Sequence, residues 1–177
     1  KYKIKIDLKT NEEIKTACIN KVKEYIVYTL FEWSVKKIMD FAEKYGIKID
    51  LNENEEIKTI CLDRVKKHIN KGDAFVAEEV MDFAEKYGIK IDLSEIETAC
   101  IGRVKECIDK GDVEGVKKIM DFAEKYGIKI DLNENEEIKT ACQKRAEGCI
   151  NGGDILGAKE IMDFAEKYGI KIDLNEN

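Results

Sequence analysis

MDFAEKYGIKIDL, residues 39–51, occurs four times in this chain without a change, beginning at Met39, Met81, Met120 and Met162. The four starts lie 42, 39 and 42 residues apart. A period of about 40 residues is typical of helical solenoids, in which each repeat is one supersecondary unit. The sequence therefore predicts an all-α protein, an α-solenoid of four helix–turn–helix repeats of about 42 residues.

Each repeat is predicted to contain two helices joined by a short turn. The first helix covers residues 136–150 in the last repeat, where apolar residues recur at helical spacing. In the third repeat, Ser94 and Glu97 form the pattern of a capping box at the start of the helix. The turn at residues 110–112 reads Lys-Gly-Asp, in which glycine ends one helix and aspartate caps the next. Neither helix buries its apolar stripe alone, so stacked hairpins are expected to share a core.

The linker at residues 128–132 alternates apolar and charged residues, as a β-strand does. Packed helices lie about 8–10 Å apart, whereas paired strands need about 4.8 Å. Equivalent linkers of adjacent repeats therefore cannot form a β-ladder. We predict an extended connector in which Ile128, Ile130 and Leu132 enter the core.

We predict that residues 1–177 form one α-solenoid domain. Its repeats cover approximately residues 9–51, 52–93, 94–132 and 133–174. Residues 1–8 match residues 44–51 except at Gly46, and residues 175–177 match the opening of another repeat. These matches predict that the chain is part of a longer array.

The second half of each repeat carries a resemblance to a known family. Residues 110–120, followed by Gly127 and the extended linker, resemble the second half of an ankyrin repeat. The ankyrin opening Thr-Pro-Leu-His is missing, the first helix is several residues longer, and the repeat length is closer to that of HEAT-type units. The chain thus resembles ankyrin-like or HEAT-like repeats in general plan. This resemblance implies protein–protein binding.

The charge balance argues against two classes of partner. The formal net charge is −6, and the lysines are interspersed with glutamates instead of being pooled into one patch. Nucleic-acid recognition normally needs a basic patch. No apolar run reaches the roughly 18 residues of a membrane span. We therefore expect neither a nucleic acid nor a membrane as partner.

The six cysteines favour a reducing compartment. Four of them occupy the same position in successive repeats: Cys18, Cys61, Cys100 and Cys142. Stacking would place these about 10 Å apart, beyond the roughly 7 Å between Cα atoms that a disulfide allows. We interpret the cysteines as buried free thiols that pack as small hydrophobic residues. Free thiols persist in a reducing compartment, which predicts a cytoplasmic location.

Few residues indicate a metal-binding or catalytic role. His68, the single histidine, would form with Cys61 and Cys107 a metal site of only three scattered ligands, whereas structural zinc takes four with tight spacing. We expect a core or half-buried histidine instead. No glycine-rich phosphate loop is present, and no nucleophile–histidine–acid pattern surrounds Ser34 or Ser94. We therefore expect no metal, no cofactor and no enzymatic activity.

The repeats differ most around the turn between their two helices. In the first repeat this turn is one residue longer, and large apolar side chains crowd it. Clustered apolar side chains at a solvent-facing turn indicate an interface. The predicted partner-binding residues of this turn are Tyr28, Leu30, Phe31 and Trp33. Phe75, which occupies the position of Trp33 in the second repeat, is predicted to bind the partner as well. The alternative is that the aromatic cluster covers the end of the stack or packs on a preceding repeat.

The predicted function is a cytoplasmic protein-interaction scaffold that binds a protein partner of unknown identity through the varied turn edge. The alternative is a self-assembling structural array, in which uncapped repeats stack head to tail. Concentration-dependent sedimentation separates the two, because a scaffold stays monomeric. An enzyme built on a helical array ranks third, since nothing in the pattern favours two distant carboxylates converging.

Overall fold

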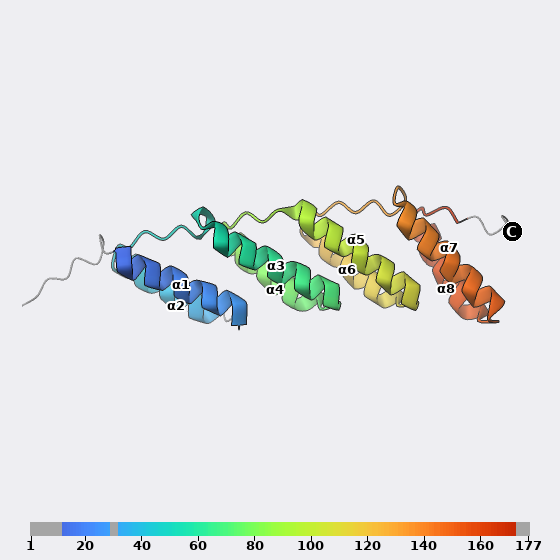
Figure 1. Ribbon diagram of the computed structural model, residues 1–177, viewed down its shortest axis with the longest axis horizontal. Helices are drawn as coiled ribbons and strands as arrows, with labels where there is room; N and C mark the ends of the chain where they lie inside the picture. The colour runs from blue at the N-terminus through green and yellow to red at the C-terminus, as the bar shows by residue number, and fades with distance from the viewer. Residues whose placement is uncertain (1–11, 29–31, 173–177) are drawn as a thin grey trace, which may run out of the picture. The chain divides into compact units, whose positions relative to one another are not determined.

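The computed structural model describes residues 12–28 and 32–172, and this part of the chain is all-helical (Figure 1). It is 78% helical and contains no β-strand. The predicted fold class is therefore confirmed at the level of all-α. Across the same ranges, no helix combines the length and the hydrophobicity that a membrane span requires.

Helices follow one another in pairs along the described chain. In chain order they are α1 (Glu12–Tyr28), α2 (Glu32–Lys44), the 3-10 helix η1 (Leu51–Glu53), α3 (Glu55–Lys71), α4 (Ala74–Lys86), α5 (Leu93–Lys110), α6 (Val113–Lys125), α7 (Glu136–Asn151) and α8 (Ile155–Lys167). The range of α7 agrees with the first helix predicted over residues 136–150. Four helical hairpins result, one for each sequence repeat.

The second helix of every hairpin ends in the same way. After α6, Ile128 donates its backbone N–H to the carbonyl of Ala123, five residues earlier, at 2.8 Å. This hydrogen bond requires a left-handed residue just before the isoleucine, which glycine adopts without steric strain. The glycines at this position have φ between 66° and 69°: Gly46, Gly88, Gly127 and Gly169. The helix end thus explains why glycine occupies this position in every repeat.

The linkers are extended connectors, as predicted. After α6, Ile128 and Leu132 are buried, Ile130 is half-buried, and Lys129 faces solvent. No linker within the described ranges forms a strand. Asn52 in one linker instead accepts, through its Oδ1 atom, the backbone N–H of Lys90 in the next at 2.9 Å.

The start of α5 corrects the predicted capping box. The helix begins at Leu93, and its N-cap is Asp92, whose side chain accepts the N–H of Ser94 at 2.9 Å. Ser94 therefore lies inside the first turn, and its hydroxyl donates to the same Asp92 carboxylate at 2.7 Å. The physical reason is the three-residue deletion in this repeat. It brings the linker aspartate directly to the helix start, where a carboxylate satisfies the free N–H groups.

Internal contacts divide the chain into two compact units. Unit 1 comprises Lys1–Val65 and Glu78–Ile91, and unit 2 comprises Lys66–Ala77 and Asp92–Asn177. Unit 2 therefore contains α5 to α8 together with the turn between α3 and α4.

In unit 1, α3 is joined to α1 by charged side chains. Lys23 on α1 forms an ion pair with Glu56 on α3. Arg64 donates from its Nη1 atom to the carbonyl of Ile26 and, at 2.5 Å, to that of Val27. The last carbonyls of a helix have no partner within the helix, so Arg64 satisfies two that α1 leaves free.

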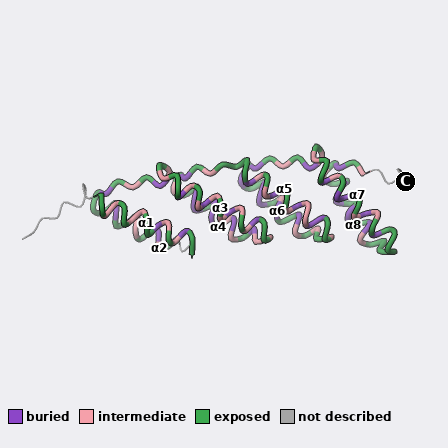
Figure 2. The backbone as a smooth tube through the Cα atoms, in the orientation of Figure 1, coloured by how far each residue is buried: buried purple, intermediate pink, exposed green. Residues whose placement is uncertain are grey.

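In unit 2, the hairpin α5–α6 lies beside the hairpin α7–α8 (Figure 1). The first helices α5 and α7 pack closely, whereas α6 and α8 touch at fewer positions. Buried residues line the inner faces of these helices (Figure 2). Burying each large apolar side chain contributes about 1.5–3 kcal/mol. The largest that are fully buried in α5 to α8 are Ile96, Ile108, Ile119, Phe122, Ile138 and Ile161.

Candidate functional site

The turn between α5 and α6 is built as the sequence predicted. Gly111 ends α5 with φ of 73°, and the Asp112 side chain accepts the N–H of Gly115 at 2.9 Å. A Cβ atom on Gly115 would lie 2.3 Å from Asp112 Oδ2, so a larger residue here needs a small shift of that carboxylate; α4 makes the same cap with Val76, whose N–H donates to Asp73 Oδ1 at 3.3 Å. Asp154 accepts the N–H of Gly157 in the same way before α8, at 2.9 Å. These caps place the two residues after each aspartate at the outer end of the hairpin.

Large apolar side chains are exposed at the turns of unit 2. Phe75 is 71% exposed and Leu156 is 77% exposed. Both occupy the same repeat position, where α6 carries the exposed Glu114 instead. Ile155, beside Leu156, also faces solvent. Ile155 and Leu156 form an adjacent pair, which marks a binding surface more strongly than a single exposed residue such as Phe75 does.

The turn of unit 1 shows the same feature with aromatic residues. Tyr28 at the end of α1 is 75% exposed, and Trp33 at the start of α2 is 66% exposed. The ammonium group of Lys37 lies 3.4 Å from the centre of the Trp33 ring, a cation–π contact. Leu30 and Phe31, the other predicted binding residues of this turn, lie outside the described residues.

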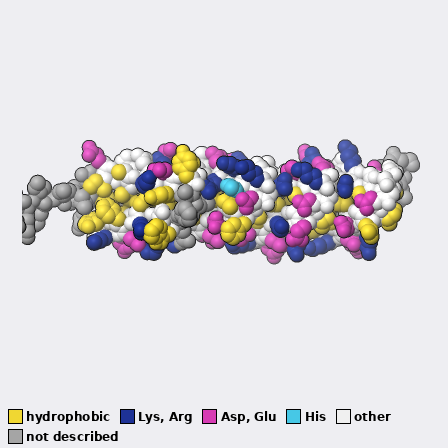
Figure 3. All heavy atoms as spheres, turned by 90° about the horizontal axis from the view of Figure 1, so that it is seen from below, with side chains coloured by type: hydrophobic (Ala, Val, Ile, Leu, Met, Phe, Trp, Pro, Cys, Tyr) yellow, Lys and Arg dark blue, Asp and Glu magenta, His cyan; other side chains and the backbone are white. Residues whose placement is uncertain are grey.

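Exposed apolar residues lie at the turns of each unit, and we call these residues the turn edge of that unit. In unit 1 they are Val27, Tyr28 and Trp33, and in unit 2 they are Phe75, Ile150, Ile155 and Leu156. Figure 3 looks onto this side of the hairpins and shows hydrophobic side chains at the surface among acidic and basic ones. Ile155 and Leu156 were not predicted as binding residues. The available signal was an apolar pair placed directly after the capping Asp154.

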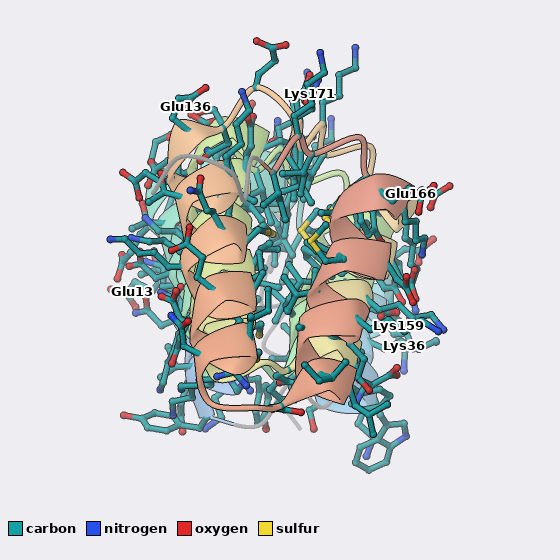
Figure 4. All side chains as sticks on the ribbon, turned by 90° about the vertical axis from the view of Figure 1, so that its right-hand side faces the viewer. Glu13, Lys36, Glu136, Lys159, Glu166 and Lys171 are labelled. Atoms are coloured by element: carbon teal, nitrogen blue, oxygen red, sulfur yellow. The ribbon has the colours of Figure 1, made fainter. Side chains whose placement is uncertain are left out.

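The opposite ends of the hairpins carry charge instead. Lys171 in the last linker projects away from the helices, and Glu136 marks the linker end of α7 (Figure 4). On the outer side of α8, Lys159 and Glu166 point away from α7 (Figure 4). The exposed linker residues include three lysines and two aspartates: Lys48, Lys90, Lys129, Asp50 and Asp131. Among the described residues, the large apolar side chains with the highest exposed fractions lie at the turns, whereas Tyr45 and Leu93 near the linker ends are 39% and 38% exposed.

An open groove of about 560 Å³ lies between α1 and α2, lined from Glu13 near the start of α1 to Trp33 at the start of α2. We call this surface the end groove. Apolar residues form much of it: Ile14, Ala17, Cys18, Ile38 and Phe41. Glu13, Lys21 and Trp33 also line it, so Trp33 belongs to both the end groove and the turn edge. A second groove, of about 600 Å³ between α6 and α8, is lined by side chains of both charges.

The cysteines are free, and five of the six are buried, as predicted; Cys18 is half-buried. Burial raises the pKa of the Cys61 and Cys100 thiols to about 12. A thiol with so high a pKa carries almost no thiolate at neutral pH, and the thiolate is the reactive form. These cysteines therefore act as apolar packing groups.

His68 is half-buried beside the turn between α3 and α4, as predicted. Its Nδ1 atom lies 3.2 Å from Oδ2 of Asp73, the aspartate that caps α4. Cys107 contacts Asp112 from the same repeat position. Within the described ranges, no group of three or more histidine, cysteine or acidic side chains is placed to hold a metal ion.

Comparison with known proteins adds no assignment to this geometry. No protein-family model, curated protein or solved structure matches the chain.

Proposed function

We propose that the four hairpins form one continuous α-solenoid over residues 1–177, ankyrin-like or HEAT-like in general plan, and that it acts as a protein-interaction scaffold. The partner is a protein that binds the turn edge. The observation that carries the proposal is the exposure of large apolar side chains at the turns of three of the four hairpins. A few residues supply most of the binding energy at protein interfaces, and tryptophan and tyrosine, as at Trp33 and Tyr28, are enriched among them.

Recurring contacts between hairpins support the solenoid. Arg145 on α7 reaches Gly111 at the end of α5, and Arg103 on α5 reaches Gly72 at the end of α3, just as Arg64 reaches the end of α1. A second set of contacts also recurs at one repeat position. These are the ion pairs Lys23–Glu56, Lys66–Glu95 and Lys105–Glu137. A contact repeated at one register is what a solenoid with a constant rotation per repeat produces.

The carboxylates of the invariant motif support a non-catalytic role. Asp40 pairs with Lys36 on the surface of α2 at 2.7 Å, and Glu166 points into solvent (Figure 4). Surface pairs one helical turn apart stabilise a helix slightly and need no other function. The net charge of −6 favours a protein over a nucleic acid as partner. The free cysteines favour the cytoplasm.

Two variants with polar turn edges test this proposal. Phe75→Ser with Leu156→Ser changes the turns of unit 2, and Tyr28→Ser with Trp33→Ser changes that of unit 1. Leu93→Ser is the matched control, because Leu93 is an exposed leucine at the linker end of α5. Proteins captured from cell extract by the unmodified chain are quantified for each variant by mass spectrometry.

We expect specific partners to be lost by about tenfold or more with at least one turn-edge variant and retained with Leu93→Ser. Circular dichroism should show unchanged helicity in all three variants. Equal capture by the turn-edge variants and the control would refute binding at the turn edge. Because Trp33 is the single tryptophan, its fluorescence reports directly whether a captured partner covers that turn.

A further inference from the structure

The turn between α7 and α8 contains the one asparagine of the chain that is followed by glycine, Asn151 before Gly152. Both residues are exposed, at the end of the hairpin opposite to the linker (Figure 1). The same repeat position carries Asn70 in the second repeat and Asp109 in the third, each exposed and each followed by lysine. Exposure at this position therefore recurs through the repeats, whereas the glycine neighbour is particular to Asn151.

An asparagine followed by glycine can react with its own backbone. The backbone nitrogen of the second residue can close a succinimide ring onto the side-chain amide carbon of the first. Glycine has no side chain beside that nitrogen and adopts backbone conformations that other residues avoid, so it hinders ring closure least. The attacking nitrogen and the amide carbon are held close together by the chain, which gives the reaction a high effective concentration.

In the folded chain a hydrogen bond protects the attacking nitrogen. Gly152 donates its N–H to the carbonyl of Gly148 at 3.0 Å, and Asn151 is the last residue of α7. Ring closure requires both residues to leave helical geometry. In α3, by contrast, Asn70 is followed by one more helical residue, Lys71. The reaction at Asn151 thus depends on opening of the final turn of α7.

The final turn of α7 is weaker than that of α3. Gly148 and Gly152 stand where α3 has Lys67 and Lys71. Glycine favours a helix less than lysine does, because ordering its backbone costs more entropy. The last turn of α7 also contains no basic side chain, whereas the last turn of α3 does, and a cation there interacts favourably with the helix C-terminus. The two glycines alone make the open turn about tenfold more populated than in α3.

We propose that Asn151 is a site of spontaneous deamidation, with the backbone nitrogen of Gly152 as the nucleophile. A bond forms between this nitrogen and Cγ of Asn151, the Cγ–Nδ2 bond breaks, and ammonia leaves with the amide proton of Gly152. Water then opens the succinimide. Breaking the ring bond from the nitrogen to Cγ gives aspartate, and breaking its bond to the main-chain carbonyl carbon gives isoaspartate. The reaction consumes only water and changes no oxidation state.

The modification adds a negative charge to the turn of unit 2. Residue 151 directly follows Ile150, which is 46% exposed, so the charge enters the turn edge of this unit. A carboxylate at this position fits a helix, because Asp109 occupies it in α5. It also lies at a helix C-terminus, where the helix dipole disfavours an anion. The product therefore weakens the final turn of α7 further.

Incubation of the purified chain at mildly alkaline pH in water enriched in heavy oxygen tests the proposal. After digestion in ordinary water, peptide mass spectrometry quantifies the labelled product at Asn151 and, as the internal control, at Asn70. We expect the labelled fraction at Asn151 to be at least about tenfold larger, with both aspartate and isoaspartate present. Equal fractions at the two asparagines would overturn the proposal. The heavy-oxygen label separates this reaction from deamidation during digestion.

Two substitutions separate the nucleophile from the opening of the helix. Gly152→Lys restores the Asn-Lys pair of the second repeat, and we expect the modification to fall to the level of Asn70. Gly148→Ala keeps the Asn-Gly pair and strengthens the helix, and a Cβ atom there meets no other atom within 4 Å. We expect this variant to react about fourfold more slowly than the unmodified chain.

The same two variants in concentrated urea provide the control for folding. With α7 unfolded, Gly148→Ala should react as fast as the unmodified chain, while Gly152→Lys should stay slow. The assignment of Gly152 as nucleophile is overturned if Gly152→Lys leaves the rate unchanged. The role of helix opening is overturned if Gly148→Ala leaves the rate of the folded chain unchanged.

Discussion

The first and the last hairpin carry the same thirteen-residue motif but bury it to different extents. Phe41 on α2 is 40% exposed and Phe164 on α8 is 5% exposed. Cys18 is half-buried on α1, while its equivalent Cys142 on α7 is fully buried. The hairpin α5–α6 packs on α7–α8, and no described residue packs on the corresponding face of α1–α2. Identical sequence thus yields a core or a surface according to its neighbour.

This difference shows where the stability of a repeat array resides. A hairpin contributes its own helices and turn, and the interface with the next hairpin contributes the rest. The ring contact within the helix is the same at both ends, since Phe41–Tyr45 and Phe164–Tyr168 both have centroids 4.8 Å apart. What separates the two phenylalanines is therefore the neighbouring hairpin alone.

Truncating the two phenylalanines should give the largest contrast. Phe164→Ala removes a buried ring from a packed interface and should lower the free energy of unfolding by about 3–5 kcal/mol. Phe41→Ala removes a ring that is already partly in water and should lower it by less than about 1 kcal/mol. Urea unfolding followed by circular dichroism measures both. Equal losses would show that both phenylalanines draw their stabilisation from within their own hairpins.

The arginine contacts between hairpins should give the next largest effect. Arg64→Ala leaves the carbonyls of Ile26 and Val27 without this donor and should lower the free energy of unfolding by about 2 kcal/mol. Lys21 is its equivalent on α1, where it contacts Glu24 at 2.7 Å and the Tyr25 ring on the surface, so Lys21→Ala should lower stability by less than about 1 kcal/mol. The same urea titration measures both. A loss with Lys21→Ala as large as that with Arg64→Ala would contradict the role assigned to the hairpin interface.

Much of the fold could be predicted because the repeated residues mark where each helix begins and ends. Thirteen identical residues fixed the register, and a glycine after each second helix gave the helix end, since that position needs a positive φ. The turn at Gly111 and Asp112 followed from cap chemistry that depends on adjacent residues alone. Local rules of this kind need no knowledge of the neighbouring hairpin.

The features that sequence reasoning missed depend on neighbours or on the backbone. Arg64 donates to main-chain carbonyls, and such an acceptor cannot be recognised from the side chains that the sequence specifies. The capping box at Ser94 failed because the deletion moved Asp92 onto the helix start. For the binding surface, Trp33 was predicted as a turn residue, but its place in the end groove follows from the packing of α1 against α2. Leu30 and Phe31 stay predictions, since they lie outside the described residues.

The pH dependence of stability should give the smallest contrast between the hairpins. Burial raises the pKa of the Cys100 thiol from its ordinary value of 9.0 to about 12. Between these two values the unfolded chain has lost this proton while the folded chain keeps it. The free energy of unfolding therefore falls as pH rises above about 9, by at most about 1.4 kcal/mol per pH unit for this thiol, and the contribution is fully present below pH 9.

Replacing Cys100 removes the contribution of its thiol to the fall of the free energy of unfolding with pH. The other groups that titrate in the same range are left in place. Cys100→Ala should make the decline between pH 9 and 10 shallower. Cys18→Ala is the matched control, because Cys18 occupies the same repeat position but is only half-buried. Denaturant unfolding at several pH values measures the slopes. If both substitutions flatten the decline equally, the thiol of the first hairpin is as well shielded as those of the later ones, and the end groove is covered in solution.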